Sequence, residues 1–526
     1  MGGIVPIASR HMRYNNSDFN GPLLRLRNLH MTLPAYSSLT TVFTRLYRYQ
    51  HLGAFMGWDQ AAMMPPGGNE ARGAALAELQ LLMHQTLTDP TLPALMTKAG
   101  NEKLDDGQRA SLHEMRRDWE PANLLPARLV EAQSLAGSRC EHAWRTQRKA
   151  NDWPGFLANF RAVVTLAREE AHTLSQAQGV SPYDALMGKY EPGTRSADID
   201  AIFGQVKTWL PGLIAQVRDR QADEPVIQGQ GPFSTESQRA LGTEIMGLLG
   251  FDFSAGRLDI STHPFCGGVA QDVRITTRYS DDDFMRSMMG IVHETGHARY
   301  EQRLPRETAH LPVGRARSMG IHESQSLSFE MQLGRSPGFL ALISPLVKKH
   351  LGDQPAFDPA NLARLYTRVN PGFIRVDADE LTYPAHVILR YEIERALMEG
   401  DIEAEDIPAL WDEKMMHYLG MDTRGNYQNG CLQDIHWTGG SFGYFPSYTL
   451  GAMYAAQYFA CIRQAHPDLD TQVAAGQLSP IFDWLEQNIW RQASRWETPE
   501  LIKRATGEAL NPAHFRAHLE KRYLGA

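Results

Sequence analysis

Cysteine is scarce in this sequence, and its spacing argues against two kinds of site. Only 4 of the 526 residues are cysteine, and no two of them form a CxxC pair. We therefore expect neither a disulfide framework nor a cysteine-ligated zinc site, and a reducing, cytoplasmic compartment fits best. The cysteines are Cys140, Cys266, Cys431 and Cys461.

An excess of basic charge and long apolar runs are also missing. Lysine and arginine together number 52 against 60 acidic residues, which gives a formal net charge of −8. Nucleic-acid-binding proteins normally carry a basic footprint, so we expect no nucleic-acid partner. The sequence has no run of eighteen apolar residues, which a membrane span would need, so we expect no membrane association.

The first thirty residues differ in composition from the rest. They hold four arginines against a single acidic residue and lack the continuous apolar stretch of a secretory signal. We interpret residues 1–30 as an N-terminal extension, either disordered or preceding a native start at Met31, with an organellar targeting segment as the alternative. Residues 31–526 are then expected to form a single catalytic domain.

Most of the chain has the apolar spacing of amphipathic helices. From Leu39 to about Trp119 the pattern is mostly helical, and it is broken at 63–68, where the sequence MMPPGG predicts a turn. The fold class we predict is mainly α, a large helical fold with one small β-sheet. Further helices are predicted at 155–175, 197–221, 234–249, 320–350, 357–369 and 379–399, and a glycine- and aromatic-rich loop at 430–451.

The predicted sheet lies directly before the most informative helix. Residues 263–280, HPFCGGVAQDVRITTRYS, contain paired glycines followed by a β-branched alternating run, which predicts a β-hairpin. The acidic residues of SDDDF then suit the beginning of a helix. We expect that helix to run through residues 288–305, with Pro305 marking its end.

This helix carries two histidines at the spacing of a zinc site. His293 and His297 are four residues apart, so both lie on one helix face and can bind one metal ion. Glu294 is then placed to take a proton from a metal-activated water. Gly296 costs about 1 kcal/mol relative to alanine inside a helix, which suggests tight backbone packing there, and we expect the sheet to be the neighbour. The alternative is an ordinary amphipathic helix, because HExxH is a short motif.

A catalytic zinc site uses three protein ligands, and the third should come from another helix. Residues 320–330, GIHESQSLSFE, offer His322 and Glu323, and spacing alone leaves both open. Glu301 lies one turn beyond His297 but about 12 Å along the axis from His293. We therefore expect Glu301 to lie behind the ligand residues and not to bind the metal ion itself.

At this point the sequence resembles the carboxypeptidase Taq family of metallocarboxypeptidases. A series of motifs occurs in the family's order, and the resemblance covers residues 32–526. The motifs are WDQAAMMPPGG at 58–68, HPF at 263–265, DVRIT at 272–276, HETGH at 293–297, HESQS at 322–326, IRVDAD at 374–379 and GCLQDIHW at 430–437.

The resemblance implies a fold, an activity and a ligand set. The fold would be a neurolysin-like helical one with a deep central groove, and the activity a broad-specificity removal of single amino acids from peptide C-termini. Family members use one divalent metal ion, zinc or else cobalt or manganese, and are typically homodimers. Carried over to this sequence, His293, His297 and Glu323 are the metal ligands and Glu294 is the general base.

A carboxypeptidase must also recognise a free carboxylate, which arginine does through two parallel hydrogen bonds. The family pattern points to Arg375 for the terminal carboxylate and to Arg274 for closing the groove near the scissile bond. The alternative for each is a structural ion pair, Arg274 with Asp272 and Arg375 with Asp377 or Asp379.

The oxyanion formed during hydrolysis needs a donor besides the metal. Tyr444 and His436, both in the glycine- and aromatic-rich loop, are the candidates, although either could serve only to pack that loop. Two other functions remain open from the sequence. One is a metallo-oligopeptidase or dipeptidase of similar fold, and the other is a catalytically silent helical scaffold that keeps the motif as core.

Overall fold

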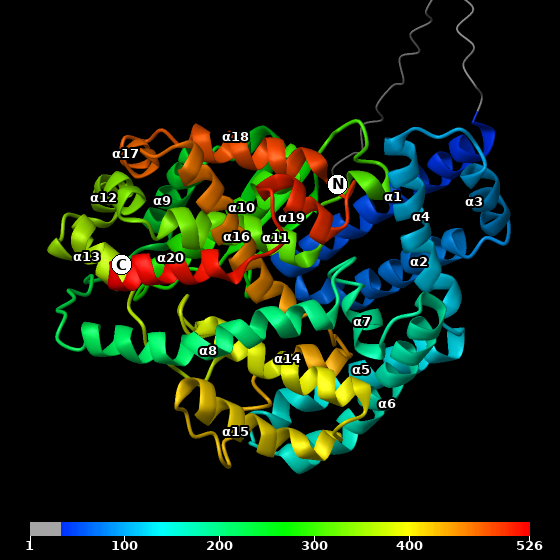
Figure 1. Ribbon diagram of the computed structural model, residues 1–526, viewed down its shortest axis with the longest axis horizontal. Coiled ribbons are helices and arrows are strands. Elements are labelled where there is room, and N and C mark those ends of the chain that lie inside the picture. Colours follow the sequence, from blue (N-terminus) through cyan, green and yellow to red (C-terminus); the bar gives the residue numbers. More distant parts are fainter. Residues whose placement is uncertain (1–32, 526) are drawn as a thin grey trace, which may run out of the picture.

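The computed structural model describes residues 33–525, and it is built almost entirely from helices (Figure 1). The predicted extension at residues 1–30 lies outside the described residues. Nine α-helices of this part precede the sheet and eleven follow it, which confirms the prediction of a mainly helical fold with one small sheet. The first group is α1 Pro34–Ala62, α2 Asn69–Leu87, α3 Leu92–Gly100, α4 Asp106–Leu124, α5 Ala127–Gln147, α6 Trp153–Gln178, α7 Pro182–Met187, α8 Ser196–Gln221 and α9 Thr235–Leu248. The second group is α10 Phe284–Arg303, α11 Met319–Leu327, α12 Pro337–Leu351, α13 Pro359–Tyr366, α14 Tyr383–Glu399, α15 Ile407–Leu419, α16 Pro446–Ala465, α17 Leu469–Ala474, α18 Ser479–Asn488, α19 Thr498–Thr506 and α20 Pro512–Leu524.

The sheet has three strands, one more than the sequence predicts. Strands β2 (Phe265–Val269) and β3 (Asp272–Thr277) pair antiparallel and form the expected hairpin. Strand β1 (Gly256–Ile260) was not predicted, and it pairs in parallel with β3, so the order is β1-β3-β2. Within the described sheet β2 pairs with a strand on one side only, so it is an edge strand, whose outer backbone groups can pair with a further strand.

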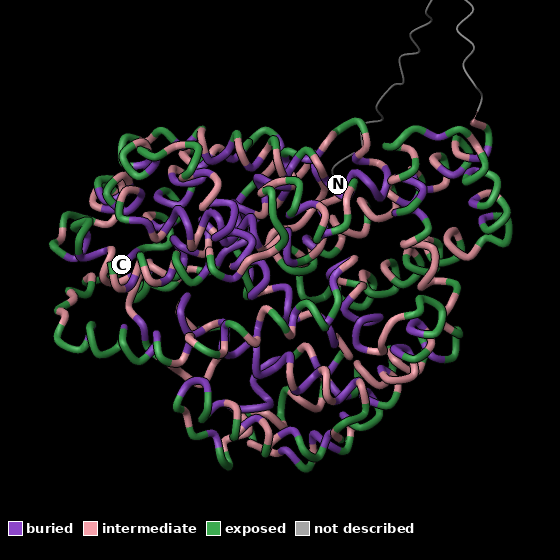
Figure 2. Tube along the Cα trace, in the orientation of Figure 1, coloured by how far each residue is buried: buried purple, intermediate pink, exposed green. Residues whose placement is uncertain are grey.

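Helix α10 lies in the interior of the molecule (Figures 1 and 2). It begins after Asp283, whose carboxylate accepts hydrogen bonds from the backbone N–H groups of Met285 and Arg286 at 3.0 and 3.2 Å. Such a cap satisfies donors that a helix beginning leaves free. The helix ends at Arg303, two residues before the predicted stop at Pro305. It packs against α9, α11 and β3, so both of its histidines are held inside the fold.

The segment predicted as one helix near 320–350 consists of three pieces. Helix α11 runs into a π-helical stretch, Ser328–Gly334, and α12 begins only after Ser336, whose hydroxyl caps it. Single π-turns are rare and occur often at functional sites, because the extra residue shifts which side chains face a neighbour. The predicted loop at 430–451 also ends earlier than expected, since α16 begins at Pro446.

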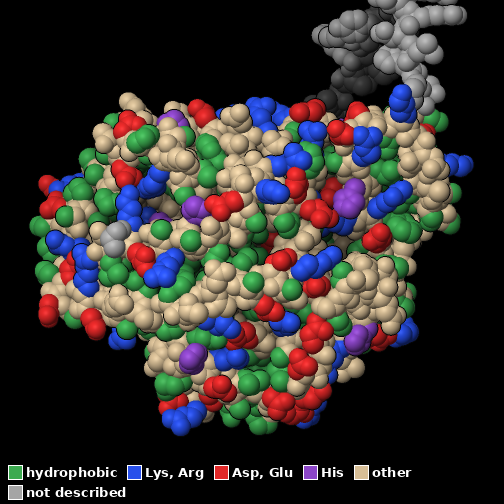
Figure 3. All heavy atoms as spheres, in the orientation of Figure 1, with side chains coloured by type: hydrophobic (Ala, Val, Ile, Leu, Met, Phe, Trp, Pro, Cys, Tyr) green, Lys and Arg blue, Asp and Glu red, His purple; other side chains and the backbone are tan. Residues whose placement is uncertain are grey.

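The described surface mixes both signs of charge, as Figure 3 shows for one face, where Lys and Arg are interspersed with Asp and Glu. Among residues 33–525, no helix is both long enough and apolar enough to cross a membrane.

Candidate metal centre and substrate cleft

A large cleft, with a volume of about 1260 Å³, lies between α10, α11, β2, the turn around Arg375 and α16. Its lining contains most of the residues that the sequence singles out. These are His293, Glu294, His297, His322, Glu323, Arg375 and Tyr444. The fold therefore brings residues as far apart in the sequence as His293 and Tyr444 to one hollow.

The three candidate metal ligands converge on one point. One donor atom from each of His293, His297 and Glu323 lies within 4.8 Å of the other two. The Nε2 atoms of His293 and His297 are 3.9 and 3.5 Å from Glu323 Oε2. Two imidazole nitrogens and one carboxylate oxygen make a donor set that zinc accepts, with room for a fourth ligand. The residues present therefore fit a divalent metal ion.

His322, the rival third ligand, faces away from this point. Its Nδ1 lies 2.7 Å from Nδ1 of His297, on the opposite side of that ring from Glu323, and its Nε2 lies 2.9 Å from Glu301 Oε1. Glu301 is thus behind the ligands, where the helix geometry predicts it.

Glu294 stands next to the metal ligands in the cleft, and only 8 % of its surface is exposed. Burial raises the pKa of its carboxyl to about 7, although the neighbouring charge of His293 opposes the rise. A group that exchanges a proton near neutral pH is suited to act as a general base and then as a general acid.

Glu330 is a further residue of this site that the sequence reasoning missed. It belongs to the π-helical stretch, and its Oε2 lies 2.8 Å from Nδ1 of His293. Its other oxygen accepts a hydrogen bond from Arg335 Nη2 at 2.6 Å. No motif in the sequence marks Glu330, because its approach to His293 depends on the π-turn.

Gly296 packs against α11 and not against the sheet, which corrects the expectation from the sequence. A Cβ at this position would stand 2.5 Å from the carbonyl oxygen of Gln325 and 2.7 Å from the α-carbon of Ser326. The glycine thus allows the helix with the two histidines to lie directly against the helix that carries Glu323.

Arg375 is nearly buried at one wall of the cleft, with 5 % of its surface exposed. Its Nε and Nη2 donate to the two carboxylate oxygens of Asp434 at 3.0 and 2.9 Å, and its Nη1 donates to the hydroxyl of Tyr383 at 2.6 Å. The ion-pair partner is therefore neither Asp377 nor Asp379, the two alternatives expected from the sequence. Asp434 belongs to the QDIHW motif, so this motif and IRVDAD meet in the fold.

Arg274 is not among the residues that line the cleft. It forms a bidentate ion pair with Asp272, with distances of 2.9 and 2.8 Å. This is the structural ion pair that the sequence offered as the alternative for Arg274. Its guanidinium also lies 4.0 Å from the ring centre of Phe55 and 4.4 Å from that of Trp58, both on α1. These contacts join β3 to the N-terminal helix.

Of the two candidate oxyanion donors, Tyr444 lines the cleft and His436 does not. The two rings are stacked, with centres 5.6 Å apart. Burial, together with the nearby charge of Arg390, lowers the pKa of His436 to about 4. Tyr444 is thus the nearer of the two to the metal ligands' cleft, with His436 packed behind it.

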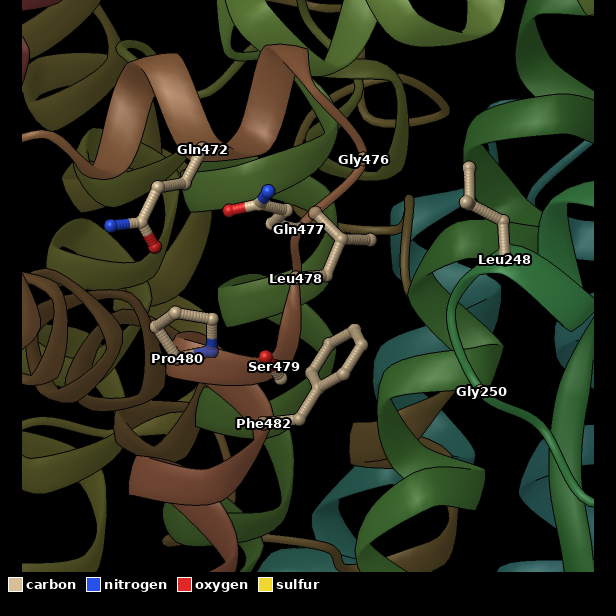
Figure 4. Close-up of a pocket in the computed structure, with 9 residues that line it drawn as sticks. All are labelled: Leu248, Gly250, Gln472, Gly476, Gln477, Leu478, Ser479, Pro480 and Phe482. Carbon is tan, nitrogen blue, oxygen red and sulfur yellow. The ribbon is translucent and has the colours of Figure 1, made fainter.

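A second hollow, of about 530 Å³, lies between the end of α9 and the segment joining α17 to α18 (Figure 4). Its lining side chains are amides, hydroxyl and apolar groups, among them Gln472, Gln477 and Phe482, and none of them ionises near neutral pH. The chemistry of hydrolysis therefore points to the larger cleft.

Comparison with known proteins now decides the family. Residues 38–523 match the family model described as carboxypeptidase Taq (M32) metallopeptidase. The chain belongs to this family. It is 37% identical over 503 residues to thermostable carboxypeptidase 1 of Thermus thermophilus, covering 93% of this chain and 98% of that protein. It is 33% identical over 487 residues to carboxypeptidase 1 of Bacillus subtilis, covering 91% of this chain and 96% of that protein.

Solved structures of M32 enzymes share the fold. Trypanosoma cruzi metallocarboxypeptidase 1 superimposes with a TM-score of 0.92 at 48% identity, over 94% of this chain and all 100% of that chain. A Pyrococcus furiosus carboxypeptidase superimposes with a TM-score of 0.89 at 32% identity, over 93% of this chain and 99% of that one. The predicted family, the helical fold and the activity of a metal-dependent carboxypeptidase are thereby confirmed.

Proposed function

We propose that this metal-dependent carboxypeptidase removes single amino acids from the free C-termini of peptides, with broad specificity. The observation that carries the proposal is the position of Arg375 in the same cleft as the cluster of His293, His297 and Glu323. The guanidinium of Arg375 suits a terminal carboxylate, and the cluster suits a metal ion that acts on the adjacent peptide bond.

The metal ion that we propose is zinc, with cobalt or manganese as substitutes, held by His293, His297 and Glu323. Zinc takes nitrogen and oxygen donors in a tetrahedral arrangement, and a catalytic site keeps its fourth position open. When bound, such an ion would lower the pKa of a water molecule and polarise the substrate carbonyl.

Glu294 is proposed as the residue that moves protons. Its carboxylate takes a proton from the attacking water and then gives it to the nitrogen of the leaving amino acid. Both transfers occur in a cleft where Glu294 is mostly shielded from solvent, so the proton stays with the reacting groups. Tyr444 is proposed to donate its phenolic hydrogen to the oxyanion, with His436 supporting its ring by stacking.

The guanidinium of Arg375 keeps two donors for the substrate. Of its five N–H groups, one on Nε and one on Nη2 go to Asp434, and one on Nη1 goes to Tyr383. One N–H on each terminal nitrogen therefore has no partner within the described chain. Two such donors match the two oxygens of a carboxylate, and Asp434 fixes the direction in which they point.

Strand β2 is proposed to hold the main chain of the substrate. Phe265 and Cys266 of this strand line the cleft, and the strand has a free edge within the described sheet. An extended peptide can add to such an edge through backbone hydrogen bonds, which do not depend on side chains. This arrangement supports broad specificity. Arg274 is proposed to hold the sheet against α1 at this side of the groove.

A pair of matched peptides tests the activity. The purified protein, loaded with zinc, is incubated with one peptide that has a free C-terminus and with the same peptide amidated. We expect a ladder of single-residue losses from the free peptide, seen by mass spectrometry, and no ladder from the amidated one. Equal cleavage of both peptides, or release of internal fragments, would instead favour the metallo-oligopeptidase or dipeptidase reading. No cleavage with zinc, cobalt or manganese would favour a silent scaffold.

We also propose that the enzyme is a homodimer. Helix α2 has 19 residues and none of them is buried, although several are leucine. Leu81 and Leu82 on α2 are 49% and 41% exposed, and Met63 beside the helix is 50% exposed. Exposed apolar side chains of this kind favour a partner surface, and a second copy would cover them. Replacing Leu81 and Leu82 by glutamate should give a monomer by light scattering, whereas Met416→Glu, an equally exposed site on α15, should leave the dimer intact.

The whole of residues 31–526 is proposed to act as one catalytic domain in the cytoplasm. The main hydrophobic core includes residues from Cys140 to Tyr523, so most of the described chain shares it. All four cysteines are free thiols, which suits a reducing compartment. Cell fractionation with an antibody to the protein would test the location.

A further inference from the structure

Each imidazole that faces Glu323 has its other ring nitrogen in contact with a second residue. Nδ1 of His293 lies 2.8 Å from Glu330 Oε2, and Nδ1 of His297 lies 2.7 Å from Nδ1 of His322. Both rings would hold a metal ion at the convergence point through the lone pair of Nε2. Each neutral ring must therefore carry its hydrogen on Nδ1, and the residue behind it determines whether it does.

For His293 the arrangement behind the ring is direct. Glu330 can only accept at its ionised carboxylate, so the hydrogen of His293 lies on Nδ1 and Nε2 is free. Arg335 holds Glu330 in place through its other oxygen. A carboxylate behind a ligand histidine is a common arrangement in metal sites.

For His297 the group behind the ring is another imidazole, which can either donate or accept. If His297 donates from Nδ1, the neutral ring of His322 accepts at Nδ1 and carries its own hydrogen on Nε2. That hydrogen points at Glu301 Oε1, 2.9 Å away. Every contact in the series from His297 through His322 to Glu301 is then one donor facing one acceptor.

The opposite direction of hydrogen bonding is inconsistent with the contacts at both ends of the series. If neutral His322 donated from Nδ1, its Nε2 lone pair would face the carboxylate of Glu301, and two acceptors would meet. His297 would also carry its hydrogen on Nε2, where it would block the metal. The carbonyl oxygen of His322, 3.1 Å from Nδ1 of His297, is a second acceptor on the same side. With a metal bound, the geometry therefore admits only one direction of hydrogen bonding, from His297 through His322 to Glu301.

We propose that His322 and Glu301 are positioning residues, which act as a two-step relay to hold His297 in the form that presents Nε2 to the metal. This proposal rests on the proposed metal site. The two helices that supply the ligands also supply the relay, since Glu301 follows His297 by one turn on α10 and His322 precedes Glu323 on α11. The HES sequence thus divides two tasks between neighbouring residues: His322 orients one ligand and Glu323 is another.

Zinc affinity of the full-length protein tests this relay. The dissociation constant is measured on metal-free protein by competition with a chromophoric chelator. We expect His322→Ala to bind zinc about 10–100-fold more weakly than wild type, the usual effect of removing a group behind a ligand. Glu301→Ala should weaken binding in the same direction. His322→Asn should restore most of the affinity, because its Oδ1 is attached at the same distance from the backbone as Nδ1 of histidine and still accepts.

A matched control uses a remote histidine. His514, on α20, pairs with Glu508 at 2.7 Å through Nε2 and does not line the cleft, so His514→Ala should leave the zinc affinity unchanged. The relay is refuted if His322→Ala binds zinc as wild type does, or if His322→Asn binds as weakly as His322→Ala. If the metal-free His322→Ala variant melts at a lower temperature than wild type, the Glu301→Ala variant is used for the decision. Wild-type zinc affinity of Glu301→Ala would refute the relay, and weaker zinc affinity would support it.

Failure of the proposed metal site would look different. In that case wild type would bind less than one zinc ion per chain, or His297→Ala would bind zinc as tightly as wild type. Those results would refute the ligand set itself, whereas loss of affinity in His297→Ala with none in His322→Ala would refute only the relay.

Discussion

The α-carbon of Gly296 in α10 lies against the carbonyl oxygen of Gln325 in α11, which would be 2.5 Å from a Cβ at position 296. Because α10 carries the two histidines and α11 carries Glu323, the distance between these helices sets the distance between the proposed ligands. The glycine is thus part of the metal site without offering a donor atom.

Gly296→Ala should push the two helices apart. We expect the free energy of unfolding to fall by about 1–3 kcal/mol, as for other overpacked sites, and the zinc affinity to fall with it. Gly290→Ala is the matched control on the same helix, because a Cβ there meets no atom within 4 Å. It should be neutral or stabilise by up to about 1 kcal/mol through helix propensity. Urea denaturation and zinc titration of both variants check this, and equal behaviour of the two would contradict it.

Glu294→Gln should abolish most of the peptidase activity while the metal stays bound. Glutamine keeps the shape of the side chain but cannot take a proton, and general-base catalysis is worth about 10²–10⁴ in rate. The measurements are the hydrolysis rate of an unblocked peptide and the metal content of the protein. Glu307→Gln, an exposed position beyond the helix, should retain wild-type rates. A fully active Glu294→Gln variant would remove Glu294 from the mechanism.

Tyr444→Phe should lower kcat and leave KM close to the wild-type value. Loss of one oxyanion donor costs about 10²–10³ in kcat, because the donor is used in the transition state and not in the bound substrate. Tyr190→Phe is the control, since this ring packs edge-on against Tyr444, with centres 5.2 Å apart, and does not line the cleft. Steady-state kinetics of both variants separate the roles. A rise in KM alone would make Tyr444 a packing or binding residue.

Asp434→Ala should destabilise the protein strongly. Asp434 pairs with Arg375 and also with Arg390, which is 0% exposed and donates to it at 3.1 Å. Removing the carboxylate deprives the buried guanidinium groups of Arg375 and Arg390 of this partner, which should lower the free energy of unfolding by about 3–5 kcal/mol. Asp422→Ala removes an equally bidentate pair, with Arg424, from the surface and should change nothing measurable. Urea denaturation of the two variants compares them, and similar midpoints would contradict the prediction.

Glu191 should make the stability depend on pH in the weakly acidic range. Its side chain is fully buried, and one carboxylate oxygen accepts the backbone N–H of Gly320 at the beginning of α11. Burial raises the pKa of Glu191 from its ordinary 4.5 to about 7, although the hydrogen bond from Gly320 opposes the rise. Between these values the unfolded chain has lost the proton and the folded chain still holds it. The stabilisation is therefore complete below pH 4.5 and is lost as the pH rises through about 7.

Glu191→Gln removes this proton from both states. The free energy of unfolding of the variant, measured against wild type, should shift in favour of the variant between pH 4.5 and 7. The slope of this difference cannot exceed about 1.4 kcal/mol per pH unit, the limit for one proton. This difference in the free energy of unfolding should not change with pH below about 4.5 or above about 7. A difference that stays constant across the range would show that Glu191 ionises normally in the folded protein.

Local patterns predicted the parts of the fold that depend on near neighbours in sequence. The break at 63–68, the hairpin and the beginning of α10 all follow from proline, paired glycines and a capping aspartate, whose effects reach only a few residues. Strand β1 was missed because its partner β3 lies beyond β2, and the pairing is a long-range one. The π-turn at Ser328–Gly334 was missed for a similar reason, since the sequence there reads as ordinary helix.

By itself the sequence determined the family and the members of the candidate metal cluster. The i, i+4 spacing places His293 and His297 on one helix face whatever surrounds them, and the ordered motifs name Glu323. The tertiary structure alone decided which groups stand behind these residues. Glu330 reaches His293 through a π-turn, His322 and Glu301 reach His297 across two helices, and Asp434 reaches Arg375 from another motif. Such contacts join residues up to 59 positions apart, so the helix packing sets them and no local periodicity records them.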